Sequence, residues 1–220
     1  MHSKKSVCQS LNDMKAICTI LCLFICQVSQ AQQVFSFDIS SDWAKLNEVA
    51  QSVVVLKNQD DFLPVKQLDV WKIASLSVGA LAETPFQQTL SLYTPTTHFQ
   101  LSAQSNSLAV DSVSAMLDKS DWVILSLHEE ISENEALQVL VARLMGNGKN
   151  VVCTFLPTET FMKLDWLDKP RSLIMAANNH VETQTYVAQA IFGGVEKTGK
   201  LSQPVGKIYP AGTGLALPNR

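Results

Sequence analysis

Residues Trp122–Pro157 read WVILSLHEEISENEALQVLVARLMGNGKNVVCTFLP. The first six, Trp122–Leu127, are apolar almost without a break, which is typical of a strand covered on both faces of its sheet. Residues 137–144 then carry an apolar stripe with helical spacing, and Asn150–Pro157 is a second apolar run. A strand, a helix and a strand of these lengths predict two parallel strands joined by a crossover helix.

The same alternation continues on both sides of this segment. Further strands are expected at Lys72–Gly79, His98–Ala103 and Ser172–Ala177, and Val53–Leu56 is either a strand or the end of a helix. Further helices are expected at Asp42–Gln51, Phe86–Tyr93, Asp111–Asp118 and Val181–Phe192. The pattern predicts an α/β fold, namely a three-layer α/β/α sandwich with a mostly parallel sheet of five or six strands.

The central helix has recognisable end signals. Ser132 and Glu135 have the spacing of a capping box, which predicts the start of the helix near Ser132. Gly146-Asn147-Gly148 predicts its end, because glycine readily adopts the left-handed conformation that terminates helices.

The first 31 residues have the composition of a cleavable signal peptide. Lys4, Lys5 and Lys15 precede or flank a short apolar run, residues 16–26, and Ser29-Gln30-Ala31 places small residues where cleavage occurs. The apolar run is shorter than the roughly 20 residues that span a bilayer, although an uncleaved membrane anchor is the alternative. We therefore expect export to the periplasm or the extracellular space, with a signal peptide at 1–31, one α/β domain at 32–202 and an irregular tail at 203–220.

Cysteine and charge narrow the functional classes. Of five cysteines, Cys153 alone follows the predicted cleavage site, and its apolar neighbours indicate a small core residue rather than a reactive thiol. Cleavage would remove three lysines and one aspartate from 17 basic and 20 acidic residues, leaving a net charge of −5. A mildly acidic chain without basic clusters is not expected to bind nucleic acid, or a membrane after cleavage. No metal or cofactor motif is present, so none is expected.

Three strings point to a family. Gln51–Val65 reads QSVVVLKNQDDFLPV, Asp121–Leu127 is followed at a loop-and-helix distance by Asn150–Phe155, and Ala188–Leu201 reads AQAIFGGVEKTGKL. In this order and at this spacing they resemble the C-terminal α/β domain of family 3 glycoside hydrolases. The Phe-Gly-Gly form and the Tyr209–Pro218 tail look most like the N-acetylglucosaminidase branch, with the β-glucosidase branch also similar.

The resemblance implies an enzyme part rather than a whole enzyme. In that family the nucleophile and most sugar contacts lie on an N-terminal catalytic barrel, and neither the barrel nor its nucleophile motif is found in this sequence. We expect an accessory domain for carbohydrate or glycan breakdown that is not catalytic alone. A free-standing secreted module that binds carbohydrate or protein is the alternative, and an independent hydrolase is a third.

Candidate site residues follow two predicted strands. His128, Glu129 and Glu130 come after Trp122–Leu127, and Asn178, Asn179 and His180 come after the strand at 172–177. Ligands of open α/β sheets bind at the carboxyl edge of the strands, so these six residues are candidates for contact with a glycan. The structural alternative is a solvated loop and a helix N-cap, roles that suit the same residue types.

Other polar and aromatic residues are expected to be structural. His98 is expected to face solvent, and the four tryptophans are scattered along the sequence instead of forming a tandem platform. A surface made of Phe35–Asp42, His128–Glu135 and Tyr209–Leu217 is expected to bind a glycoside hydrolase barrel or to mediate self-association, because Tyr209, Leu215 and Leu217 have no evident core.

Overall fold

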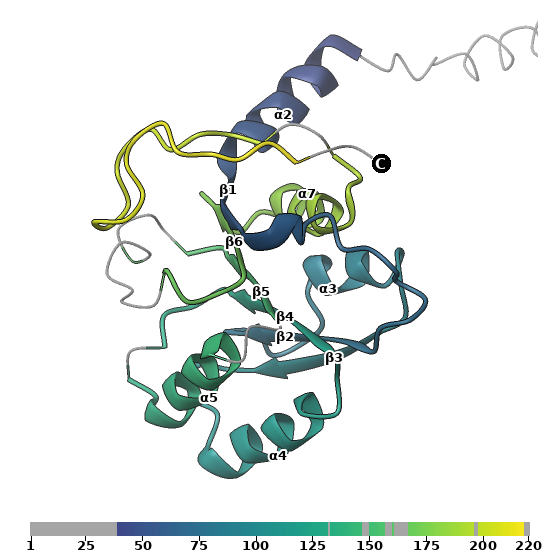
Figure 1. Ribbon diagram of the computed structural model, residues 1–220, viewed down its shortest axis with the longest axis vertical. Coiled ribbons are helices and arrows are strands. Elements are labelled where there is room, and N and C mark those ends of the chain that lie inside the picture. The colour runs from purple at the N-terminus through teal and green to yellow at the C-terminus, as the bar shows by residue number, and fades with distance from the viewer. Residues whose placement is uncertain are drawn as a thin grey trace, which may run out of the picture. The chain divides into compact units, whose positions relative to one another are not determined.

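A six-stranded sheet with the strand order β1-β6-β5-β4-β2-β3 lies at the centre of the computed structural model (Figure 1). The structure describes residues 39–131, 133–146, 150–156, 160, 167–195 and 198–217. The strands are β1 (Val53–Asn58), β2 (Ile73–Val78), β3 (Thr96–Leu101), β4 (Trp122–Leu127), β5 (Asn150–Thr154) and β6 (Ser172–Ala176). All neighbouring strands run parallel except β1, which pairs antiparallel with β6. The predicted α/β sandwich with a mostly parallel sheet is confirmed.

Helices cover both faces of this sheet in the compact unit Ala44–Arg220. They are α3 (Pro85–Leu90), α4 (Ser107–Leu117), α5 (Glu135–Gly146) and α7 (Val181–Phe192), and a further helix, α2 (Ile39–Ser52), leads directly into β1. Figure 1 shows α3 and α7 on one side of the strands and α4 and α5 on the other. Each side has its own apolar cluster, because successive residues of a strand point to opposite faces.

The expected elements lie close to the observed ones, and the first turn of α5 has a side-chain cap. The helix α5 begins at Glu135, and the side chain of Asn134 caps it by accepting a hydrogen bond of 3.1 Å from the Leu137 amide. The predicted capping box from Ser132 to Glu135 involves Ser132, which lies outside the described residues, so it stays a prediction. Asn134 takes the cap because its short amide reaches the orphan N–H groups of the first turn.

The C-terminal tail closes the β1 edge of the sheet. The Gly199 amide donates to the Val53 carbonyl over 2.6 Å, and the Leu215 amide donates to the Val55 carbonyl over 2.9 Å. This contact covers backbone groups that an edge strand would otherwise expose. It also buries Tyr209 and Leu217, so the expectation that these two residues contribute to an exposed apolar surface is wrong. Leu215 stays 42% exposed.

Some predictions concern residues outside the described part of the chain. These are the signal peptide at 1–31, the beginning of the predicted domain at 32–38, Ser132, the helix terminator at Asn147-Gly148, Trp166 and the last residues of the tail, 218–220. Within the described residues, no helix combines the length and the apolar character that crossing a membrane requires.

Candidate functional site

The carboxyl edge of the sheet has a topological switch point between β2 and β4. The chain leaves β2 for β3 on one side and returns to β4 on the other, and the two crossovers place α3 and α4 on opposite faces of the sheet. Such a reversal opens a crevice at the strand ends, where open α/β sheets bind ligands. His128–Glu130 follow β4, and Asn178–His180 follow β6 at the same edge.

A chain of side-chain contacts leads from the buried interior of the sheet to this exposed edge. Ser77 on β2 contacts Ser126 on β4 with an Oγ–Oγ distance of 2.7 Å, and Ser126 Oγ lies 3.1 Å from His128 Nε2. On the other side of the imidazole, Nδ1 lies 2.9 Å from Asn179 Oδ1. Two of the six candidates, His128 and Asn179, are thus brought into direct contact across 51 residues of sequence.

Neighbouring helices determine the direction of these hydrogen bonds. The Phe86 amide at the start of α3 donates to Gln184 Oε1 over 3.2 Å, so the other end of the Gln184 amide is its Nε2 donor. That donor reaches Asn179 Oδ1 at 2.9 Å, which makes Oδ1 an acceptor for His128 as well. Neutral His128 therefore carries its proton on Nδ1, which leaves Nε2 as an acceptor facing the Ser126 hydroxyl; that hydroxyl also lies 3.5 Å from the Leu76 carbonyl.

Packing makes His128 a poor proton carrier. Its ring stacks on Phe155, with centroids 4.8 Å apart and planes 14° from parallel. Burial lowers the pKa of His128 below its ordinary value of 6.5, although the hydrogen bond to Asn179 and the charge of Glu129 act in the opposite direction. Both ring nitrogens already have partners within the protein. His128 therefore stabilises the loop, and neither nitrogen is left to bind a ligand.

This burial predicts a pH dependence of stability. The folded-state pKa of His128 lies below 6.5, so as pH falls through that value the unfolded chain takes up a proton that the folded chain resists, and stability decreases. His98, whose pKa is also lowered by burial, acts in the same direction.

Urea titrations at pH 7.5 and at pH 5, about one pKa unit or more on either side of 6.5, test this. Between these two pH values, the free energy of unfolding should decrease less in His128→Gln than in the parent chain. The substitution His180→Gln, in an exposed side chain, is the control. If the free energy of unfolding of His128→Gln depended on pH as that of the parent chain does, a pKa of His128 lowered by burial would be contradicted.

The two glutamates of the loop have a different environment. Glu129 and Glu130 are exposed, and within the described residues neither carboxylate forms a hydrogen bond or an ion pair. Gly79, at φ +88°, follows β2 and lies directly against this loop, since a Cβ at this position would lie 2.6 Å from the backbone nitrogen of Glu129. The backbone of Glu129 is therefore held tightly while its carboxylate stays solvated.

Asn178 and His180 take part in the turn that leads into α7. The side chain of Asn178 accepts a hydrogen bond of 3.1 Å from the His180 amide and one of 2.7 Å from the Thr183 hydroxyl. His180 is the N-cap residue of α7, and its side chain makes no capping bond. These contacts match the structural role that the sequence left open, and contact of these residues with a glycan stays a prediction.

A second set of buried amides adjoins this network under α3. Gln87 is fully buried, and its Nε2 donates to Ser75 Oγ over 2.9 Å and to the Phe99 carbonyl over 3.0 Å. Ser75 Oγ in turn lies 2.7 Å from Nδ1 of His98. The other ring nitrogen, Nε2, lies 2.7 Å from Ser91 Oγ, so His98 is half-buried between two serines instead of facing solvent.

This network was not among the predictions from the sequence, although the sequence contains a signal for it. Ser75 and Ser77 occupy alternate positions of β2, and Ser126 on β4 is followed two positions later by His128, just after the strand ends. Alternate residues share a face, and Ser77 and Ser126 are register partners. Polar residues repeated every second position could therefore have indicated a polar strip beneath α3.

Two of the tryptophans meet at the opposite, amino edge of the sheet. Trp71 precedes β2, Trp122 begins β4, and their rings make an edge-to-face contact with centroids 6.2 Å apart. Phe62 stacks on Trp122 at 4.2 Å, and the guanidinium of Arg171 lies over both of these rings. Trp71 and Trp122 are far apart in the sequence, and parallel strands bring them together because both lie at strand starts; this contact is of the sheet-packing kind.

Metal and thiol chemistry find little support in the described residues. In that part of the chain, His, Cys, Asp and Glu side chains form no group of three or more that could hold a metal ion. Cys153 is fully buried on β5, and burial raises the pKa of its thiol, as expected for a core residue.

Comparison with solved structures gives the fold a context. A glycoside hydrolase family 3 β-N-acetylglucosaminidase from Paenibacillus sp. str. FPU-7 matches with a TM-score of 0.59 and 14% identity, over 73% of this chain and 32% of that one. A β-glucosidase from Listeria innocua matches with a TM-score of 0.59 and 20% identity, over 79% and 28% of the two chains. This is the fold of a domain of family 3 glycosidases. The resemblance predicted from three sequence strings is thereby confirmed as a likeness of fold.

The likeness covers only part of each neighbour. A fungal multi-domain family 3 β-N-acetylglucosaminidase, with a TM-score of 0.58 and 16% identity, is matched over 76% of this chain and 19% of its own length. This chain thus spans 19–32% of the three family 3-type structures described. The sequence itself matches no protein-family model and no curated protein.

Proposed function

We propose that this chain is an accessory α/β domain of a family 3-type glycoside hydrolase, acting in carbohydrate or glycan breakdown and not catalytic alone. The observation that carries the proposal is the match of most of this chain to a minor part of several glycosidases. Fold alone does not establish function, so the chemistry at the carboxyl edge has to agree with it.

The groups at that edge are consistent with a supporting role. Retaining glycosidases use two carboxyl groups about 5 Å apart, one of which is a nucleophile in a defined position. Here the side chains with defined positions, Ser126, His128 and Asn179, are neutral and hydrogen-bonded to one another. The carboxylates of Glu129 and Glu130 are exposed, and no described hydrogen bond orients them. This arrangement favours a surface for docking or for substrate contact over a catalytic pair.

The proposed partner is a glycoside hydrolase barrel, which would contact the loop at His128–Glu135 and the strand ends around Asn179. Charged residues at the rim of an interface affect specificity and association rate. Glu129 and Glu130 would lie at such a rim, where they would discriminate between partners.

One observation favours the alternative of a free-standing secreted binding module. The tail packs on β1 and buries Tyr209 and Leu217, so the described residues complete this edge of the sheet without a neighbour. Self-association, a further expectation, would then have to use another surface.

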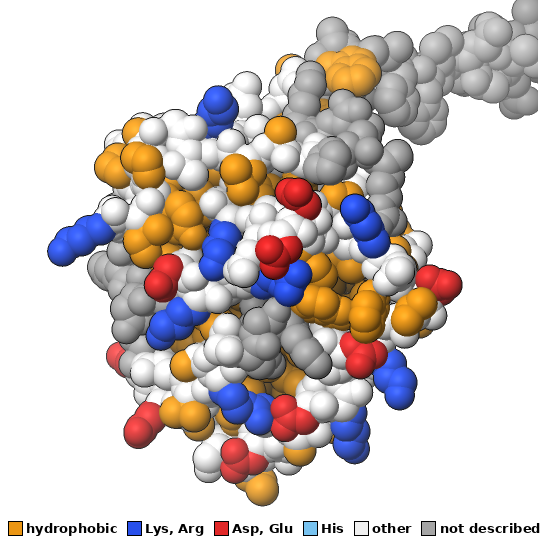
Figure 2. All heavy atoms as spheres, in the orientation of Figure 1, with side chains coloured by type: hydrophobic (Ala, Val, Ile, Leu, Met, Phe, Trp, Pro, Cys, Tyr) orange, Lys and Arg blue, Asp and Glu red, His pale blue; other side chains and the backbone are white. Residues whose placement is uncertain are grey.

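We further propose export, with cleavage after Ala31. Lys4, Lys5 and Lys15, the apolar run at 16–26 and Ser29-Gln30-Ala31 support it. On the face shown in Figure 2, acidic and basic side chains are interspersed, which suits a protein that does not bind nucleic acid or an anionic membrane.

Sedimentation of the purified chain with a family 3 barrel from the same organism tests the accessory role. We expect a complex with the parent chain and a weaker one with Glu129→Arg/Glu130→Arg, because charge reversal at an interface rim opposes docking. The substitution Asp111→Arg, on the exposed side of α4, is the matched control. Aryl β-glucosides and aryl N-acetyl-β-glucosaminides should not be hydrolysed by the chain alone.

Two results would contradict the proposal. A chain that stays monomeric and ignores the barrel would favour the binding module. Hydrolysis by the chain alone that disappears in Glu129→Gln or Glu130→Gln would make it an independent hydrolase.

A further inference from the structure

A pocket of about 680 Å³ lies at the amino edge of the sheet, away from the candidate site described above. It is formed by the loop before β2, the first half of β3 and the end of α4. Its volume is within the range of about 300–1,000 Å³ that is typical of small-molecule sites. Neither the sequence strings nor the hydrogen-bond network assigns a role to it.

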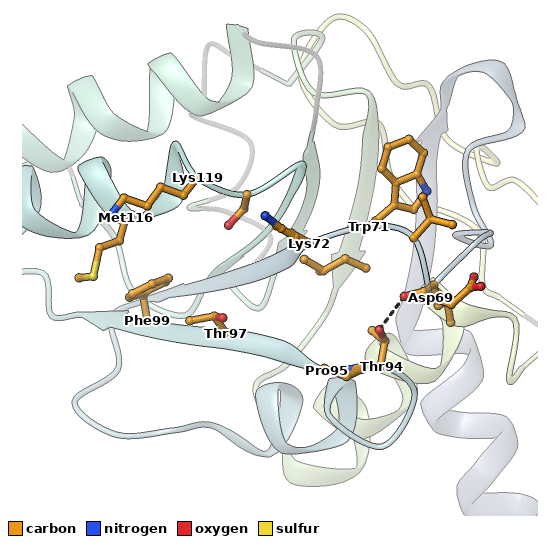
Figure 3. A pocket seen from close by; sticks show the side chains of 13 residues that line it. Asp69, Trp71, Lys72, Thr94, Pro95, Thr97, Phe99, Met116 and Lys119 are labelled. Atoms are coloured by element: carbon orange, nitrogen blue, oxygen red, sulfur yellow. Dashed lines mark hydrogen bonds between the residues drawn. The ribbon is translucent and has the colours of Figure 1, made fainter.

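The two long sides of this pocket differ in chemistry. In Figure 3, Phe99 and Thr97 from β3 lie on one side, and Lys72 and Lys119 extend along the other. Met116, which is 42% exposed, closes one end near Phe99. The pocket therefore offers an apolar ring and a thioether opposite two ammonium groups, the mixture of apolar walls and few polar groups that ligand sites have.

Both lysines lack a carboxylate partner within the described residues. Among nearby acidic groups, Asp118 pairs with Arg143 at 3.1 Å, and Asp121 accepts a hydrogen bond of 3.0 Å from the backbone amide of Lys72. The carboxylate of Asp69, which also lines the pocket, points away from the two lysine side chains in Figure 3. Two positive charges thus face the pocket while the neighbouring negative charges are engaged or directed elsewhere.

Charge complementarity therefore determines the kind of ligand. We propose that this pocket binds a small ring compound that carries a carboxylate, with the ring against Phe99 and the carboxylate between Lys72 and Lys119. Charge-assisted hydrogen bonds from ammonium groups are stronger than neutral ones, and an aromatic wall accepts the apolar face of a ring. An acidic monosaccharide and an aromatic carboxylic acid both have this chemistry.

The site does not depend on the proposed accessory role, because it lies at the other edge of the sheet. Binding of a carboxylate here and docking of a barrel at the carboxyl edge can each fail while the other holds. The two proposals are thus tested separately.

Isothermal titration of the purified chain with glucuronate and with benzoate tests the proposal, and glucose and benzyl alcohol are the neutral counterparts. We expect saturable binding of at least one acid, and no binding of its neutral counterpart. The double substitution Lys72→Gln/Lys119→Gln should weaken that binding by about tenfold or more, which corresponds to about 1.4 kcal/mol. Lys45→Gln/Lys207→Gln, in two exposed lysines outside the pocket, should bind as the parent chain does.

Each outcome has a definite meaning. Binding of glucuronate alone identifies an acidic sugar as the ligand type, and binding of benzoate alone identifies an aromatic acid. Binding of neither acid, equal binding of acids and neutral counterparts, or unchanged affinity in Lys72→Gln/Lys119→Gln would overturn the proposal. Far-ultraviolet circular dichroism of each variant establishes that the exposed substitutions leave the fold intact.

Discussion

Gln184→Leu is expected to lower the free energy of unfolding by about 2 kcal/mol, because the buried amide of Phe86 loses its acceptor and such a loss costs about 1–3 kcal/mol. Gln184 is buried on α7, where it accepts from the Phe86 amide and donates to Asn179 Oδ1. Leucine has a similar volume, so the change removes hydrogen bonds with little change in packing. Urea denaturation measures the effect.

The control is the same substitution one and a half turns further along the helix. Gln189→Leu changes a half-buried side chain for which no hydrogen bond is described, and we expect its effect to stay within about 0.5 kcal/mol. A loss in Gln184→Leu no larger than that in Gln189→Leu would show that the buried network contributes little to stability.

A second measurement separates the network from ordinary packing. In the parent chain, Gln184 holds Asn179 Oδ1 toward His128, which keeps the imidazole proton on Nδ1. Without Gln184, the Asn179 amide can turn over, and a mixture of His128 tautomers is expected. Nitrogen chemical shifts of the imidazole report the tautomer directly. A pure Nδ1–H form in Gln184→Leu would mean that another contact orients Asn179.

Strands and helices were predictable because their signals are local. The apolar run Trp122–Leu127 is β4 without change of boundary, and Val181–Phe192 is α7. Both depend on spacing within one segment, which a sequence displays directly. The antiparallel direction of β1 was not predictable in this way, because it depends on where the chain goes after a short run of valines.

The candidate site was predicted as an edge of the sheet but not as a set of contacts. The rule that ligands bind at carboxyl ends located His128 and Asn179 at one edge. Their hydrogen bond depends on Gln184 and Phe86, which come from two helices far apart in the sequence. Buried glutamines are uncommon, so a helix pattern alone places such residues on the solvent side.

Tertiary contacts also explain why the tail was misjudged. Tyr209 and Leu217 are isolated apolar residues in a segment without regular structure, and no local pattern shows where they pack. They are buried because Gly199 and Leu215 hydrogen-bond to β1 and hold the tail against the unit. The core of this edge is thus completed by residues about 150 positions after β1.

The largest effect of a glycine substitution is therefore expected at Gly199. An added Cβ would overlap the carbonyl oxygen of Gln51 and lie 2.7 Å from its carbonyl carbon, both in the backbone of α2. A shift of the backbone at Gly199 away from α2 would break the hydrogen bond from the Gly199 amide to the Val53 carbonyl. Overpacking of this kind costs about 1–3 kcal/mol and sometimes more, so Gly199→Ala should lower the free energy of unfolding by about 3 kcal/mol.

Gly146→Ala provides the matched control for this prediction. A Cβ at Gly146, the last residue of α5, would meet no atom within 4 Å, so its effect should stay within about 0.5 kcal/mol. Urea denaturation gives both values, and hydrogen exchange of the amides at positions 199 and 215, which donate to Val53 and Val55, shows whether the tail has separated from β1. We expect faster exchange at both amides in Gly199→Ala alone. Equal stability of the two variants, with protected tail amides in both, would contradict the prediction. It would mean that α2 and the tail adjust to the added Cβ without loss of stability, so that the close contact at Gly199 does not stabilise this edge.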